Sequence, residues 1–320
     1  MRDLARLVKR KAKYGVECFR EFMQPIKLPA RRERIRINFN FHVEDIADTE
    51  TYIAFREFVK GLADAAQAKP LLCVTTPHCP QTRCQMKQNH LCEEEYEERV
   101  KELARYSEIG YHGHFFSKKK GKLDGAVAEW IGDMLYSMAW ADGLNPMGSS
   151  NFERAVVENQ MREEIAWLKG IGIEPFAYVA GWWFMNEDVA LLLEQNGIKI
   201  DFSVRQRHPD TFGGRYLQNG SLPPHGEPFI LPPTKGVIEV RSVFYPVEHP
   251  RRSKEFFRDT VVHSPDSPLY VVFPSHEGEA IHFSRELMDN ALATRRMKGI
   301  FEWQDLSTQL SEISSSLGLA

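Results

Sequence analysis

Two histidines lie one residue apart at the end of an apolar run in "EIGYHGHFF", residues 108–116. Side chains alternate along an extended chain, so His112 and His114 point to the same side, and Gly113 between them allows close approach of the backbone. Two imidazoles presented together are able to bind one metal ion. Structural histidines would show the same spacing, so the interpretation depends on what accompanies them.

A second group of bases and hard ligands occurs in "FNFHVED", residues 39–45. Strand alternation places its apolar residues on one face and its polar residues, among them His42 and Glu44, on the other. One carboxylate beside two histidines is a common catalytic zinc set that leaves a position for water and substrate. The competing interpretation is that Asp45 or Asp48 only caps the next helix.

Polar or aromatic residues also lie within or at the ends of three further apolar runs. Trp182 and Trp183 in "VAGWWF" suit an aromatic wall against which sugars pack, although core packing of one indole is equally consistent with the sequence. Asp201 lies within another run, at 198–204, and His276 ends a third. His276 could donate a proton to a leaving group while a nearby carboxylate raises its pKa, or the two residues could form a structural pair.

Four of the five cysteines lie close together in the sequence, three of them in "PHCPQTRCQMKQNHLC", residues 77–92. A second metal ion could be held there by Cys79, Cys84, His90 and Cys92. The spacing contains no Cys-x-x-Cys pair, and reduced, partly buried thiols are the alternative.

Short apolar or alternating runs between turn residues predict seven strands, at 34–42, 70–76, 107–114, 174–180, 198–204, 236–244 and 269–276. Helical patterns fill most gaps, at 50–66, 93–106 and 152–169, after Asn186 and from Ser284. Strand and helix in alternation favour parallel strands with crossover helices. We therefore expect one α/β domain over residues 34–320, a distorted (β/α)7-type barrel whose chemistry lies at the carboxyl ends of its strands.

The net charge of −3 over 320 residues carries no signature of a nucleic-acid-binding protein. The charge is uneven, because residues 1–36 contain twelve Lys or Arg and four Asp or Glu. We expect residues 1–33 to form a basic helical extension, with residues 1–24 either touching the inner membrane surface or packing on the barrel. Neither an apolar membrane span nor a secretory signal is visible, which favours the cytoplasm.

The strand ends, in this order, resemble the five motifs of the polysaccharide deacetylases of carbohydrate esterase family 4. The matching segments are "FHVED", "EIGYHGHFF", "YVAGWW", "DFSV" and "VVFPSH", within roughly residues 34–290. The resemblance implies a distorted barrel with Glu44 as base, with Asp45, His112 and His114 as metal ligands, and with Asp201 and His276 as the acid pair.

Three positions depart from the family pattern. His112-Gly-His114 replaces the usual His-x-x-x-His, and Val179 stands where the family has an arginine that orients the base. His42 stands where many members carry an additional acid, so the base remains open among His42, Glu44 and Asp45.

The resemblance implies a hydrolase that uses a divalent metal, zinc foremost, to remove an N-acetyl group from a sugar. The expected substrate is an acetylated precursor of a surface polysaccharide such as lipopolysaccharide or capsule. Two alternatives stay open: an amidase-type C–N hydrolase acting on a small nitrogen compound, and a non-catalytic barrel that binds glycan through Trp182 and Trp183.

Overall fold

A computed structural model of the chain describes residues 34–119, 127–130, 133–138, 152–203, 227–241, 269–296 and 301–319. The expected basic extension, with its membrane contact at residues 1–24, lies outside these ranges. Within them, no helix combines the length and the apolar character needed to cross a membrane.

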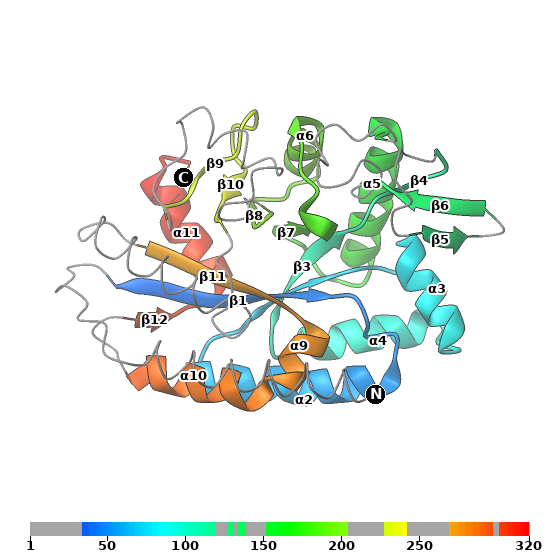
Figure 1. The fold of residues 1–320 in the computed structure, drawn as a ribbon. Helices are drawn as coiled ribbons and strands as arrows, with labels where there is room; N and C mark the ends of the chain where they lie inside the picture. Colours follow the sequence, from blue (N-terminus) through cyan, green and yellow to red (C-terminus); the bar gives the residue numbers. More distant parts are fainter. Residues whose placement is uncertain are drawn as a thin grey trace, which may run out of the picture.

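One curled, mostly parallel sheet forms the centre of the molecule and makes a partial barrel (Figure 1). Its strand order is β11-β1-β2-β3-β7-β8-β10-β9, with β12 also paired to β1. Only the pairing of β9 with β10 is antiparallel. The strands are β1 (Ile35–Val43), β2 (Leu71–Val74), β3 (Glu108–Gly113), β7 (Ala177–Ala180), β8 (Ile200–Asp201), β9 (Phe229–Ile230), β10 (Ile238–Glu239), β11 (Leu269–His276) and β12 (Phe301–Trp303). The α/β class, the distorted barrel and the seven predicted strands are confirmed.

Strand β1 has three neighbours, and this determines what lies at its carboxyl end. β11 pairs along it from Ile35↔Leu269 to His42↔His276. On its other side, β12 pairs with the first residues of β1 and β2 pairs with the last. The carboxyl ends of β1, β2 and β11 therefore meet, although β11 lies more than two hundred residues later in the chain.

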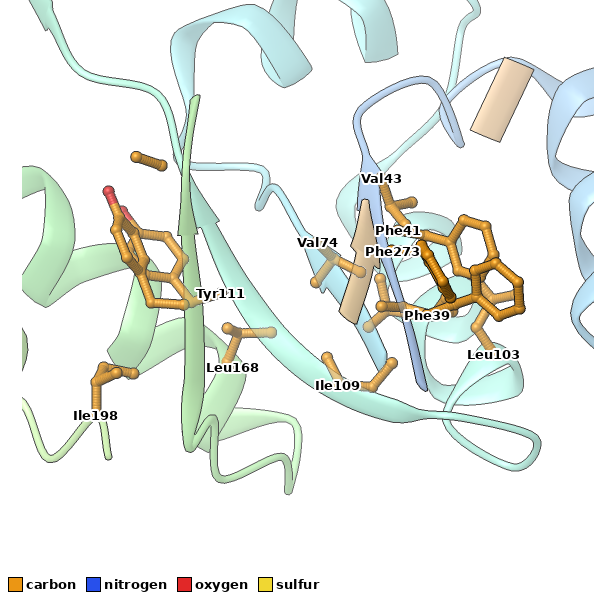
Figure 2. Packing of buried hydrophobic residues seen from close by; sticks show 14 of the residues in the cluster. Phe39, Phe41, Val43, Val74, Leu103, Ile109, Tyr111, Leu168, Ile198 and Phe273 are labelled. Carbon is orange, nitrogen blue, oxygen red and sulfur yellow. The ribbon is translucent and has the colours of Figure 1, made fainter. Parts of the chain in front are cut away.

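The alternation expected for β1 determines which side chains face the helices. Its apolar residues, among them Phe39 and Phe41, join the main core (Figure 2). The ring of Phe41 makes edge contacts with those of Phe55 and Phe58, with centroids 5.8 and 5.6 Å apart. Such aromatic pairs add about 0.5–1.5 kcal/mol each beyond area burial. The alternate residues Asn40 and His42 are buried on the opposite, inner face of the sheet.

Helices cover the outer face of the sheet, and α2 and α10 run side by side beneath β1 and β11 (Figure 1). Asp48, rather than Asp45, caps α2, and its side chain accepts a hydrogen bond from the Thr51 amide at 2.8 Å. The five expected helices are confirmed. The helices are α2 (Thr49–Ala66), α3 (Pro80–Gln88), α4 (Glu93–Leu103), α5 (Arg154–Gly170), α6 (Glu187–Gln195), α9 (Glu277–His282), α10 (Ser284–Arg296) and α11 (Leu306–Ser316).

A small antiparallel sheet follows β3 directly and was not anticipated from the sequence. It consists of β4 (Phe116–Ser117), β6 (Asp133–Ser137) and β5 (Val127–Trp130), in the order β4-β6-β5. Because β4 begins two residues after His114, this sheet anchors the chain just beyond the histidine pair.

Candidate metal centre

Three side chains converge at the carboxyl ends of β1 and β3. The Nε2 atoms of His112 and His114 lie 3.0 Å apart, and the Glu44 Oε1 atom lies 3.0 and 3.2 Å from them. Both imidazoles are buried. Within the part of the chain that the structure describes, this is the one group of three or more His, Cys, Asp or Glu residues with ligand atoms so close together. Two imidazoles and one carboxylate are a donor set that fits zinc and similar divalent ions.

The backbone of β7 fixes the orientation of His112. Its Nδ1 atom lies 2.9 Å from the carbonyl oxygen of Val179, which can only accept, so Nδ1 donates. The neutral ring then presents an unprotonated Nε2, as a metal ligand must. Burial lowers the pKa of His112 and outweighs the raising effect of Glu44. Val179, at the position of the family arginine, thus supports the site through its main chain.

The Gly181–Trp183 turn after β7 packs against the histidines. A Cβ atom at Gly181 would lie 2.5 Å from the ring of His114, so only glycine leaves room for this imidazole. Trp182 and Trp183 both adopt left-handed backbone conformations, with φ of 54° and 59°, which non-glycine residues rarely adopt. The Trp182 side chain is 50% exposed, whereas the Trp183 ring lies 5.1 Å from that of His42.

Glu44 is held from several directions. Its Oε2 atom accepts a hydrogen bond from Gln81 of α3 at 3.0 Å, which leaves Oε1 facing the imidazoles. Burial raises the pKa of Glu44, but its contacts with the imidazoles of His112, His114 and His276 outweigh burial and hold the pKa well below its usual range. Glu44 is therefore a carboxylate, ready to bind a cation.

Asp45 lies beside this cluster and not in it. Its Oδ1 atom accepts a hydrogen bond from Gln85 of α3 at 2.6 Å. Burial, followed by the negative charge of Glu44, raises its pKa. The structure therefore differs from the expected assignment, since the carboxylate facing His112 and His114 is Glu44 and not Asp45. The alternation of β1 explains the difference, because Glu44 continues the inner face on which His42 lies.

His42 and His276 complete a group of imidazoles at this edge. The ring of His42 is buried, with its centroid 4.9 Å from that of His112 and 4.9 Å from that of His276. His276 is half exposed, and its Nε2 atom lies 3.6 Å from the Glu44 Oε1 atom. A solvent-accessible imidazole beside the three ligand atoms is placed to exchange protons with a bound substrate.

The carboxylate neighbours of His276 are Glu44 and Glu279, and not the expected Asp201. Its Nδ1 atom lies 3.7 Å from the Glu279 Oε2 atom. Burial lowers the pKa of His276, but Glu279 and Glu44 together raise it to about 10. Both carboxylates therefore favour the protonated form of His276.

Asp201 is fully buried and holds the end of β7 instead. Its Oδ1 atom accepts hydrogen bonds from the amide and hydroxyl of Ser203 at 3.1 and 2.6 Å. The Ser203 hydroxyl oxygen accepts from the amide of Ala180 at 2.8 Å. Burial raises the pKa of Asp201 to about 6, although hydrogen bonds with Glu239 and Ser203 act in the opposite direction.

The cysteine segment does not form the expected second metal site. Cys79 is buried against Phe116 and Leu135, whereas Cys92 is exposed at the start of α4. Helix α3 separates these ends, with Cys84 on it and His90 after it. All four residues are among those described, and they form no group of ligand atoms.

Four site residues were missed by reading the sequence: Gln81, Gln85, Glu277 and Glu279. The spacing of His276 and Glu279, which matches the ends of a capping box, was an available signal for Glu279. Gln81 carries no such signal, because it contacts Glu44 only after α3 has folded over the end of β1. Glu277 is buried, which raises its pKa to about 7 against the lowering effect of its backbone hydrogen bonds.

Comparisons with solved structures identify the fold. A protein described as a polysaccharide deacetylase from Mycobacterium smegmatis aligns with a TM-score of 0.55 and 13% identity, over 90% of this chain and 92% of the other. A second polysaccharide deacetylase, from Pseudomonas aeruginosa PAO1, aligns with a TM-score of 0.53 and 9% identity, over 90% of this chain and 93% of the other. The PuuE allantoinase aligns with a TM-score of 0.53 and 10% identity, over 90% of this chain and 92% of the other.

Sequence comparisons add no relative, since neither a family model nor a curated protein matches the chain. The structural neighbours confirm the resemblance at the level of architecture: the chain has a polysaccharide deacetylase-like fold.

Proposed function

We propose that this chain is a metal-dependent deacetylase that hydrolyses the N-acetyl group of a sugar. The observation that carries the proposal is the convergence of Glu44, His112 and His114 with His276 beside them, in a fold shared with polysaccharide deacetylases. The proposed substrate is an acetylated, cytoplasmic precursor of a surface polysaccharide, either lipopolysaccharide or capsule.

Glu44, His112 and His114 would hold the metal ion, with zinc as the proposed ion. A divalent ion at these ligands supplies Lewis acidity for the acetyl carbonyl and lowers the pKa of a water molecule. Asp45, the remaining carboxylate of the acidic pair, accepts the proton of the attacking water. Gln85 orients Asp45 for this role.

His276 acts as the general acid. As the C–N bond breaks, the imidazolium proton passes from Nε2 to the departing amine nitrogen, and the acetyl carbon keeps the water oxygen to give acetate. Glu279 keeps His276 protonated before this step. Trp182, with its exposed indole, offers a face on which a sugar ring packs, while Trp183 packs against His42.

The test begins with metal content, measured by mass spectrometry on the wild type beside a His112→Ala/His114→Ala double variant. We expect one equivalent in the wild type and its loss in the variant. Acetate release from N-acetylated mono- and oligosaccharides should then require the metal and stop with a chelator. Metal that persists in the double variant would contradict this centre, and a metal-loaded protein that releases no acetate would contradict the deacetylase.

The amidase alternative is kept because an allantoinase shares the fold at a similar TM-score. Allantoin therefore belongs in the same assay, with ring opening as its readout. Glycan binding without turnover in the presence of zinc would instead favour a binding barrel built on Trp182 and Trp183.

A further inference from the structure

Helix α9 begins directly after His276, and its first residue contacts the main chain at the end of β1. Glu277 is 1% exposed, and its Oε1 atom accepts a hydrogen bond from the Glu44 amide at 2.7 Å. The same oxygen accepts from the Asp45 amide. One buried carboxylate thus binds two consecutive amides of the acidic pair.

The hydrogen bonds from the Glu44 and Asp45 amides to Glu277 lie just beyond the end of the strand pairing. The pairing of β1 with β11 ends at His42↔His276, and β1 itself ends at Val43. The Glu44 and Asp45 amides lie beyond the last strand pair, so the ladder does not orient them. Glu277 supplies the missing acceptor from the neighbouring strand end.

The direction of this main chain decides where the Glu44 carboxylate lies. Ligand atoms must be held within about 0.5 Å of their working positions for a metal site to function. Gln81 contacts only the tip of Glu44, and the imidazoles come from β3, so neither fixes the Glu44 backbone.

We propose that Glu277 is a positioning residue that presents Glu44 to the metal ion. The inference rests on the metal centre of the proposed function. Because Glu277 follows His276, the same bonds also fix the distance between a ligand and the general acid. A change at Glu277 therefore affects metal affinity before it affects any chemical step.

The chain contains a matched control for this arrangement at the opposite end of the sheet. Glu108, at the start of β3, accepts hydrogen bonds from the amides of Leu306 and Ser307 at 2.6 and 3.2 Å. It too binds two consecutive amides with one carboxylate, but it ties the start of β3 to α11, at the end of the strand away from His112.

The experiment is a cobalt titration of the purified full chain, followed by the visible absorption of the bound ion and by zinc competition. Glu277→Ala and Glu277→Asp should weaken cobalt binding about 10–100-fold, as loss of outer-shell partners does in metal proteins. Glu277→Gln should stay within about threefold of the wild type, because its carbonyl oxygen accepts the same two bonds. Glu108→Ala should bind cobalt with wild-type affinity and an unchanged spectrum.

Melting temperatures show which variants are folded. If Glu277→Ala does not fold, the cobalt affinity of Glu277→Asp tests the proposal in its place. Wild-type affinity in Glu277→Asp, or equal weakening in Glu277→Gln and Glu277→Ala, would overturn this inference and leave the metal centre intact. A wild type that binds neither cobalt nor zinc would overturn the metal centre, and the inference with it.

Discussion

Glu44 and Asp201 are both carboxylates just at or beyond the ends of parallel strands, yet their surroundings are opposite. Glu44 faces three imidazoles, and their hydrogen bonds hold its pKa far below the usual range despite burial. Asp201 is buried beside Ser203 and a second carboxyl group, Glu239, and its pKa is raised to about 6. The surroundings of Glu44 favour its ionised form, whereas burial lets Asp201 hold its proton up to a higher pH than an exposed carboxyl group would.

The difference shows that position at a strand end does not by itself assign a catalytic role. The partners come from neighbouring strands: His112 and His114 from β3 for Glu44, and Glu239 from β10 for Asp201. Opposite charges nearby stabilise the ionised form of a carboxyl group, and burial destabilises it. For Asp201, burial outweighs the hydrogen bonds with Glu239 and Ser203, which lower its pKa.

The largest expected effect comes from Glu44→Gln. The amide retains the hydrogen bond with Gln81 but loses the charge that balances a cation, so metal affinity should fall more than about 100-fold, beyond what outer-shell changes cost. Deacetylation should fall with it. Isothermal titration with zinc measures the first effect and acetate release the second. Retention of wild-type zinc affinity would remove Glu44 from the ligand set.

Asp201→Asn should act on stability and not on metal binding. The folded-state pKa of about 6 lies above the reference value of 3.8, so the folded protein binds more protons between these values and its free energy of unfolding falls as pH rises. Asparagine removes this dependence. Relative to the wild type, the free energy of unfolding of the variant should therefore rise by up to about 3 kcal/mol between about pH 4 and pH 7.

Denaturant unfolding of both proteins across this pH range measures the Asp201 effect. Zinc affinity of Asp201→Asn serves as the control and should match the wild type. A stability difference that does not change with pH would show that Asp201 is ionised throughout, as Glu44 is.

The smallest of these effects is expected for Glu279→Gln. With a cation neutralising Glu44, Glu279 remains as the carboxylate beside the His276 Nδ1 atom, and its loss should lower kcat about tenfold, a part of what a general acid contributes. KM should not change, because the metal ligands and Trp182 are untouched. A larger loss of kcat in Asp201→Asn than in Glu279→Gln would show that the carboxylate acting with His276 is Asp201, as expected from the sequence.

Much of the fold could be predicted because β1, β3 and β11 are continuous apolar or alternating runs with clear ends. The predicted strand at 198–204 was too long, since β8 covers only Ile200–Asp201. The Ser203 hydroxyl accepts the hydrogen bond of the Ala180 amide, a bond that a strand carbonyl would otherwise accept. Local β-propensity does not reveal such a replacement.

The candidate site was predictable in its residue types but not in its pairings. The His112 and His114 pair follows from strand alternation alone. The separation of Glu44 from Asp45 depends on Gln81, Gln85 and Glu277, which reach the acidic pair from α3 and α9. Contacts at such sequence separation leave no periodic signal. The cysteines illustrate the converse, because closeness in sequence did not bring Cys79 and Cys92 together.

The pairing of β1 with β11 has a consequence for the order in which the site is assembled. The three candidate ligands lie between residues 44 and 114, whereas His276 ends strand β11 and Glu277 begins the helix after it. During synthesis the amino-terminal part of a chain is free to fold first. Glu44, His112 and His114 are thus synthesised before His276. Docking of β11 onto β1 is therefore the step that brings His276 and Glu277 to candidate ligands that were synthesised earlier.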